Sequence, residues 1–111
     1  MDKKILSFFG LAQRSGNLIT GEDTCEIHIK KGHVRLVIVP QDASENTKKK
    51  FRDMCEFRKI QYVVFGRREE LSSAVGKSNR AVYAIKDTAF ASKIYSLIME
   101  SIEDLNSLGG E

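Results

Sequence analysis

The sequence has little cysteine and little proline, and both scarcities limit the kind of protein it can encode. Its two cysteines, Cys25 and Cys55, lack CxxC spacing and an accompanying histidine pattern, so we expect neither a disulfide nor a zinc site. Both thiols should instead act as small core hydrophobes. One proline among 111 residues, with 41% apolar and 30% charged residues, is typical of a compact α/β domain and not of a disordered chain.

Long hydrophobic runs are also absent. The longest are far shorter than the roughly 20 residues that a membrane-spanning helix needs. The N-terminal residues 1–4 lead into an amphipathic segment and not into a secretory signal. We therefore expect a cytoplasmic protein without a membrane partner, folded as one domain over residues 1–105, with a frayed acidic tail at 106–111.

Sequence signatures of enzymes are missing as well. The chain has no GxGxxG after a strand and no GxxxxGKS/T, GxSxG, HExxH or DxDxDG motif. His28 and His33 are isolated, and Glu69 and Glu70 are sequence neighbours that point about 100° apart on a helix. All four are typical of structural or solvated positions, so we expect no catalytic residue, no metal and no cofactor.

The chain has an excess of positive charge, and this charge is unevenly distributed. The net charge is +3, but residues 100–111 hold four acidic and no basic residues, so residues 1–99 carry 18 basic and 11 acidic side chains, a net of +7. A basic body with an acidic tail favours a polyanionic partner. Many small domains are mildly basic for other reasons, and solvation alone is the simpler explanation for the basic outer face of the helix expected at 44–59.

Hydrophobic periodicity indicates how helices and strands alternate. Stripes at helical spacing predict five helices, at about 3–15, 22–31, 44–59, 67–75 and 88–105. Short apolar runs between them predict four strands, at 18–19, 35–39, 61–65 and 81–85. Asp42 or Ser44 should cap the third helix, and Asp87 or Thr88 the fifth. The pattern predicts a three-layer α/β/α sandwich around a four-stranded mixed sheet.

The stretch 18–32 is the segment where a ligand is most expected. A Thr20-Gly21 turn opens a helix, and the free backbone N–H groups of a first helical turn can seat a phosphate. Thr20 followed by Asp23 also approximates a capping box, which would stabilise the helix by about 0.5–2 kcal/mol without any ligand. This turn and the loop at 76–80 should both lie at strand ends, where such folds bind ligands.

Five phrases of the chain together resemble a known family. They are LAQRSG at 11–16, LITG at 18–21, KG at 31–32, QDASENT at 41–47 and ELSSAVGKSNR at 70–80. Over about residues 5–105 the chain resembles the kink-turn-binding ribosomal proteins of the L-seven-Ae and L-thirty-e type. In its sequence motifs it is most similar to their bacterial YlxQ-like branch. The resemblance implies an α/β/α sandwich that binds bent, internally looped RNA. We expect a monomer, with structured RNA or the ribosome as its partner.

The resemblance also implies which residues contact the RNA. The first group opens the second helix and comprises Gly21, Glu22, Asp23, Thr24 and Ile27. The second group is the loop before the last strand and comprises Gly76, Lys77, Ser78, Asn79 and Arg80. Arg14 and Lys31, from the matching phrases, complete the set. A kinked internal loop exposes purine edges and crowds phosphates together, so such contacts read shape more than sequence.

Two residues of the second helix depart from the family's pattern. Position 23 is asparagine in the strongest kink-turn binders and lysine in some relatives, whereas Asp23 can only accept, for example from a guanine amino or imino group. Position 27 is commonly lysine. Ile27 should point outward while Cys25 and Ile29 face the core, and it would then pack on RNA or on a protein partner, unless a rotation of the helix buries it.

A third departure lies in the loop before the last strand. Relatives often place an apolar or aromatic residue at position 78 or 79 against an extruded base, and Ser78-Asn79 offers neither. Stacking is worth roughly 1–3 kcal/mol per base. We therefore expect weaker affinity than that of the best kink-turn binders, or a different RNA. A protein-interaction module on the same fold, with Ile27 at the contact, is the alternative function.

Overall fold

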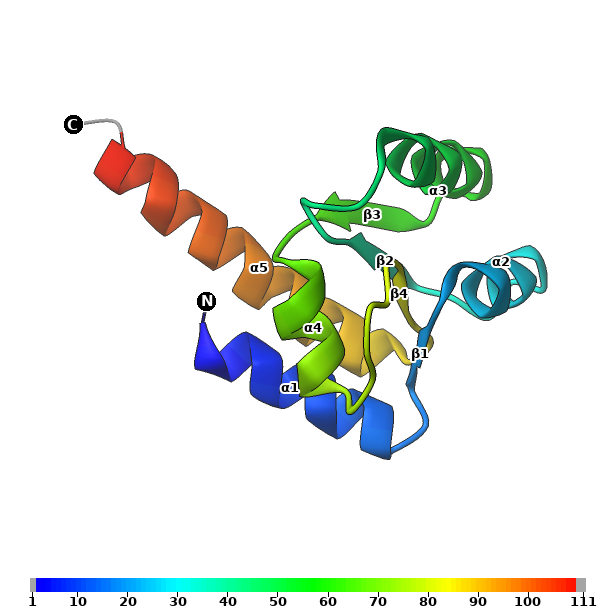
Figure 1. Cartoon of the computed structure of the whole chain (residues 1–111), viewed down its shortest axis with the longest axis horizontal. Helices are drawn as coiled ribbons and strands as arrows, with labels where there is room; N and C mark the ends of the chain where they lie inside the picture. Colours follow the sequence, from blue (N-terminus) through cyan, green and yellow to red (C-terminus); the bar gives the residue numbers. More distant parts are fainter. Residues whose placement is uncertain (1, 110–111) are drawn as a thin grey trace.

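Four short strands form one mixed sheet at the centre of the molecule (Figure 1). The structure, a computed structural model, describes residues 2–109, and side chains for residues 2–104. The strands are β1 (Leu18–Thr20), β2 (Leu36–Val39), β3 (Gln61–Val64) and β4 (Tyr83–Ile85), in the order β1-β4-β2-β3. β4 is antiparallel to both of its neighbours, and β2 is parallel to β3. The four predicted strands and the mixed sheet are confirmed, but β4 begins at Tyr83 and not at position 81.

Helices cover both faces of this sheet, which confirms the predicted α/β/α sandwich. They are α1 (Lys3–Arg14), α2 (Glu22–Lys30), α3 (Glu45–Arg58), α4 (Arg68–Ala74) and α5 (Thr88–Gly109). Figure 1 shows α1, α4 and α5 on one side of the sheet and α2 and α3 on the other. Within the described residues, no helix is both long and apolar enough to cross a membrane.

The central strand β2 joins two separate cores. All four of its side chains are buried, as expected for a strand covered on both faces. Leu36 and Ile38 pack among α1, α4 and α5, whereas Val37 and Val39 pack with α2 and α3. Cys25 and Cys55 belong to the second core, and burial raises the pKa of each thiol to about 12. Their predicted role as core hydrophobes is confirmed.

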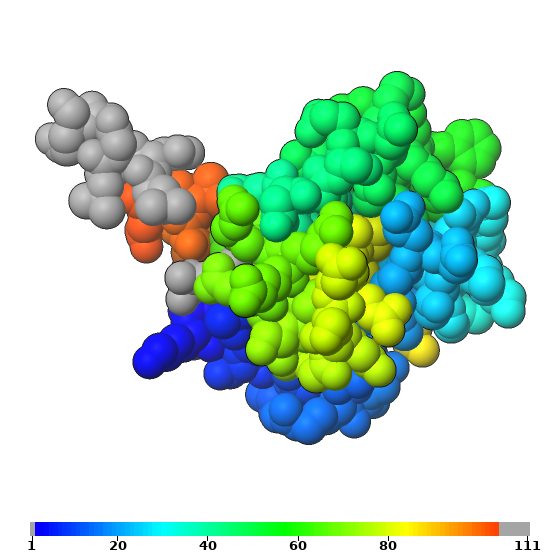
Figure 2. Space-filling model, viewed as in Figure 1, coloured from blue at the N-terminus to red at the C-terminus, as the bar shows by residue number. Residues whose placement is uncertain are grey.

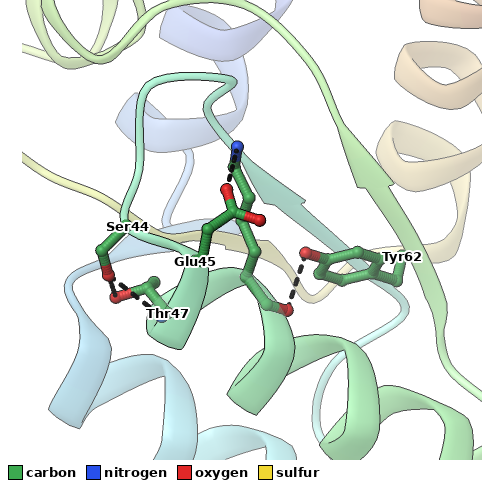
Figure 3. Close-up of polar contacts among 5 residues, drawn as sticks. Ser44, Glu45, Thr47 and Tyr62 are labelled. Carbon is green, nitrogen blue, oxygen red and sulfur yellow. Dashed lines mark hydrogen bonds and ion pairs between the residues drawn. The ribbon is translucent and has the colours of Figure 1, made fainter.

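Side-chain caps set where the longer helices begin. Ser44 Oγ accepts from the backbone N–H of Thr47 at 3.1 Å, so Ser44 caps α3 (Figure 3). Asp87 Oδ2 accepts from the N–H of Phe90 at 2.8 Å at the start of α5. Asp42, the other candidate for α3, instead accepts at 2.8 Å from the N–H of Arg68, the first residue of α4. The loop before α3 is thereby tied to the first turn of α4.

The last helix carries the apolar stripe that its sequence predicts. Ile94, Leu97 and Ile98 are buried against the sheet. Leu105, the last residue of the predicted helix, lies outside the described side chains. The backbone of residues 106–109 continues α5, so the helix runs past its predicted end at 105, and the rest of the frayed tail expected at 106–111 lies outside the described residues.

Candidate functional site

The second helix starts without a side-chain cap. Gly21 occupies the N-cap position with φ at 96°, and its own N–H donates to Val82 O at 3.0 Å. The predicted capping box was wrong, because Gly21 and not Thr20 is the capping residue and no side chain accepts from the first turn. Within residues 2–109, the backbone N–H groups of residues 22–24 have no acceptor. They remain free to donate to an external anion.

A buried pair of hydroxyls fixes the loop that faces this helix start. Ser72 Oγ accepts from the backbone N–H of Arg80 at 2.8 Å and lies 2.7 Å from Tyr83 Oη. Tyr83 Oη in turn donates to Arg80 O at 3.1 Å. Ser72 is 1% exposed and Tyr83 is fully buried. Both backbone polar groups of Arg80 are therefore held by the core, which leaves its side chain to reach outward.

The side chain of Arg80 reaches the turn that opens α2. A Cβ placed on Gly21 would lie 3.4 Å from Arg80 Nη1, so the glycine allows the guanidinium to approach the backbone closely. Around this contact lies a hollow of about 480 Å³, lined by Gly21, Glu22, Asp23, Arg68, Asn79, Arg80 and Ala81. Figure 2 shows the yellow residues near position 80 beside the blue residues that start α2. We call this hollow the α2-loop site.

Arg68 also belongs to this site, although it was not among the contact residues predicted from the sequence. Its Nη1 donates to Asn79 Oδ1 at 2.9 Å, and Asn79 has a left-handed backbone with φ at 55°. The Nε atoms of Arg68 and Arg80 are both buried without a hydrogen-bond partner in the described part of the chain. A sequence signal existed, because Arg67-Arg68 stands at the start of a helix, where the helix dipole disfavours cations.

A neighbouring hollow extends the site along α4. It has a volume of about 430 Å³, and its lining comprises Asp42, Arg68, Glu69, Ser72, Ser73, Lys77, Ser78 and Asn79. Lys77 is exposed there, and it has no ion-pair partner among the described residues. Gly76 follows the C-cap residue of α4 in a left-handed backbone with φ at 68°, and so turns the chain into this loop.

The remaining expected contact residues lie farther from the hollow. Thr24 and Ile27 are exposed on α2, and Ile27 is 52% exposed, which confirms its predicted outward orientation. Lys31 stands beyond the last residue of α2, roughly 15 Å along the helix from Gly21 at the usual rise per residue. Arg14 folds over Gly10 in the groove between α1 and α4. Neither Arg14 nor Lys31 lines the α2-loop site.

One ion pair and one hydrogen bond with α3 hold the acidic side of α2. Glu26 accepts from Lys30 at 2.8 Å and from Lys50 at 2.9 Å, and these hydrogen bonds lower the pKa of Glu26 to about 2. Glu22 accepts from the hydroxyl of Thr47 at 3.4 Å. Asp23 has no such partner in the described part of the chain, so it is the carboxylate that the α2-loop site presents to a ligand.

The basic outer face of α3 is largely neutralised within the protein. Lys49 and Arg52 both contact Asp53, and Lys48 contacts Glu45. Lys50 crosses to α2. This pairing supports solvation as the explanation for that run of charge and leaves the cations of the α2-loop site as the stronger candidates for binding an anion.

Comparison with known proteins identifies relatives of the whole domain. The profile of the "Ribosomal protein L7Ae/L30e/S12e/Gadd45 family" matches residues 3–96. A protein of Bacillus subtilis named "RNA-binding protein YlxQ" is 38% identical over 89 residues, which cover 80% of this chain and 89% of that protein.

Solved structures show the same arrangement of elements. A protein from Bacillus halodurans, described as having unknown function, matches with a TM-score of 0.84 and 41% identity over 87% of this chain and 98% of that one. A chain described as "Giardia lamblia 15.5kD RNA binding protein" matches with a TM-score of 0.72, covering 95% of this chain and 92% of that one. At 19% identity, the second match bears on the fold alone.

Proposed function

Because the chain belongs to the ribosomal protein L7Ae/L30e/S12e/Gadd45 family, and within it to the YlxQ-like branch, we propose that it is a non-enzymatic RNA-binding protein that recognises a kinked internal loop. The observation that carries the proposal is the contact between two distant segments. The uncapped start of α2 at Gly21 and the guanidinium of Arg80 meet across one hollow. Backbone donors and a cation thus face the same space.

Each part of the α2-loop site suits a feature of bent RNA. A kink brings phosphates of two strands close together, and the free N–H groups of residues 22–24 together with Arg80 offer donors for them. Arg68 lies between the two hollows, so it and Lys77 can bind phosphates farther along the backbone. Asp23 accepts from the amino or imino group of an extruded guanine. Contacts of this kind recognise the shape of the RNA and make few base-specific contacts.

The departures from the family's pattern set the expected strength of this binding. Ile27 is exposed where relatives place a lysine, which removes one charged contact, and such a loss costs about 1–3 kcal/mol. Ser78 and Asn79 supply no stacking surface, and Asn79 is engaged by Arg68. The proposal is therefore a moderate binder, in which backbone amides and the arginines of the loop contribute more than the side chains of α2.

The proposed setting of this activity is translation. The RNA is a kinked segment of ribosomal RNA or of a structured leader, and the protein acts in the cytoplasm as a monomer that associates with the ribosome. The basic body, with a net charge of +7 over residues 1–99, supports attraction to so dense a polyanion.

A charge-removal experiment tests the proposed site. Lys77→Ala combined with Arg80→Ala should weaken binding to a kink-turn RNA and lower the slope of log Kd against log salt by roughly 0.9 for each lost phosphate contact. The control is Lys4→Ala combined with Lys93→Ala, which removes the same charge from exposed positions on α1 and α5. Fluorescence anisotropy at several salt concentrations measures both. Equal slopes for the two variants would contradict the proposed site.

One observation favours a second function, a protein-interaction module. Ile27 is 52% exposed, although its helix has a buried face available. An apolar side chain at that position could bind a protein partner instead of RNA. Ile27→Asp would then abolish a nuclease-resistant interaction, while the native protein would show no affinity for kink-turn RNA.

A further inference from the structure

A second basic surface lies at the opposite end of the sheet from the α2-loop site. α2 and α3 end there, and β2 begins there. A hollow of about 420 Å³ is lined by Ile29, Lys30, Gly32, Val34, Arg35, Arg58, Lys59 and Ile60. Four of these eight residues are cationic and none is acidic. We call this hollow, together with the adjacent Lys31 and Phe57, the basic end.

The cations of the basic end are mostly unpaired. Among the described residues, Lys31, Arg35 and Lys59 have no ion-pair partner. Lys30 contacts Glu26, which also contacts Lys50 of α3. On the outer face of α3, by contrast, each lysine has an acidic partner. Cations near helix C-termini stabilise the helix dipole, which accounts for Lys31 and Lys59. The helix dipole does not account for Arg35, which precedes β2, or for the absence of acidic side chains from the lining of the hollow.

An exposed aromatic ring adjoins these cations. Phe57 is 80% exposed at the end of α3, and the guanidinium of Arg58 lies 5.2 Å from the centroid of its ring. Arg58 also lines the hollow, so ring and hollow are continuous through one side chain. Phe57 contributes to neither core. An exposed ring among unpaired cations is the arrangement on which unpaired bases stack while their phosphates are bound.

The positive field extends beyond the hollow to the neighbouring histidines. The rings of His28 and His33 lie 5.8 Å apart. Burial lowers the pKa of His28, and the charges of Lys86, His33 and Lys31 lower it further. Lys86 follows β4 at the same end of the sheet, where its N–H donates to Asn17 O at 2.8 Å. The strand ends therefore add positive charge beside the helix ends.

We infer that the basic end is a second RNA-contacting surface, which takes an unpaired segment of the same RNA, with phosphates on Arg35 and Lys59 and a base stacked on Phe57. The inference rests on the proposed function, because it assumes an RNA held at the α2-loop site. α2 has 9 residues and is about 14 Å long, so a single-stranded flank of a kinked RNA can reach from one surface to the other. The two surfaces together make the protein a bivalent RNA binder.

The test uses the native protein, two variants and three RNAs. The first variant is Phe57→Ala, and the second combines Arg35→Gln with Lys59→Asn, since asparagine tolerates the left-handed backbone at position 59 (φ 58°). The RNAs are a kink-turn with short stems, the same kink-turn with a tail of about ten uridines, and that uridine strand alone, a length within the usual range of single-strand sites. Fluorescence anisotropy gives Kd at several salt concentrations.

The native protein should bind the tailed kink-turn about tenfold more tightly than the short one, and each variant should lose most of that gain without a change on the short RNA. Removing two phosphate contacts should lower the salt slope on the uridine strand by roughly 1.4. The double variant Lys4→Gln with Lys93→Gln, which removes the same charge elsewhere, should retain the gain.

The outcomes separate this inference from the proposed function. If the native protein binds the short kink-turn but the tail adds nothing, or if the control variant loses as much as the others, the basic end is not an RNA surface. If the uridine strand binds through Phe57 while the short kink-turn does not bind, the basic end is an RNA surface and the proposed function at the α2-loop site is wrong.

Discussion

Replacing Ser72 by alanine should weaken both the fold and the binding of RNA, because its buried hydroxyl holds the loop that carries Arg80. Its hydroxyl accepts from the N–H of Arg80 at 2.8 Å and contacts Tyr83 Oη at 2.7 Å. Alanine at this position leaves the N–H of Arg80 without its acceptor and removes one of the two partners of the Tyr83 hydroxyl. Of the hydrogen bonds that hold the backbone of Arg80, only the one from Tyr83 Oη to Arg80 O then remains.

The magnitude follows from the burial of these groups. A buried donor left unsatisfied costs about 1–3 kcal/mol. Ser72 itself is 1% exposed, but its bond with Arg80 is only partly buried, so water can satisfy some of the freed N–H. We therefore expect Ser72→Ala to lower the free energy of unfolding by about 1–2 kcal/mol. The affinity for kink-turn RNA should fall by up to about tenfold, because binding must reorder the loop.

The neighbouring serine provides a matched control. Ser73 lies on the same helix, is exposed, and takes part in no contact that fixes Arg80. Ser73→Ala should change the free energy of unfolding by less than about 0.5 kcal/mol. Urea denaturation measures stability, and anisotropy with a kink-turn RNA measures affinity. Indistinguishable values for the two variants in both assays would refute the claim that the buried hydroxyls position Arg80.

Three further predictions concern α2 and the buried thiols. Ile27→Lys should tighten binding to kink-turn RNA about fivefold or more, measured by anisotropy, because it restores a charged contact without disturbing a buried residue. Glu26 has its pKa lowered from 4.5 to about 2, so its stabilising effect is complete above about pH 4.5 and is lost as the pH falls toward 2; Glu26→Gln should reduce the loss of stability over that range in urea titrations. Cys25 and Cys55, with pKa values of about 12, should resist a thiol reagent at neutral pH in the folded protein, and rapid labelling without unfolding would contradict their burial.

Local chemistry explains why so much of the fold could be predicted from the sequence. The run at 36–39 is apolar at every position because both faces of β2 are covered, and each neighbouring helix shows its own buried stripe. Ser44 and Asp87 cap helices as expected, since a cap depends only on the next three residues. Asp42 was ambiguous, because its partner is the N–H of Arg68, 26 residues later in the chain.

The site was less predictable, because it depends on contacts between distant segments. Nothing local to Gly21 indicates that Arg80 will lie against it, and only the family resemblance joined the two segments. Threonine is a common N-cap residue, which favoured Thr20, yet the N-cap position is occupied by the next residue, Gly21, with its positive φ. The place of Arg68 in the site could not be predicted, because it depends on the position of α4 beside the loop that holds Asn79.

The most direct test of the central claim is the affinity of the native protein for two RNAs that differ only in the internal loop. One carries a kink-turn, and the other is the corresponding uninterrupted duplex, both with short stems and at moderate salt. If the α2-loop site recognises a kink, the kink-turn should bind at least tenfold more tightly, equivalent to about 1.4 kcal/mol. Equal dissociation constants would show that the protein reads only charge, and would contradict recognition of a kinked loop.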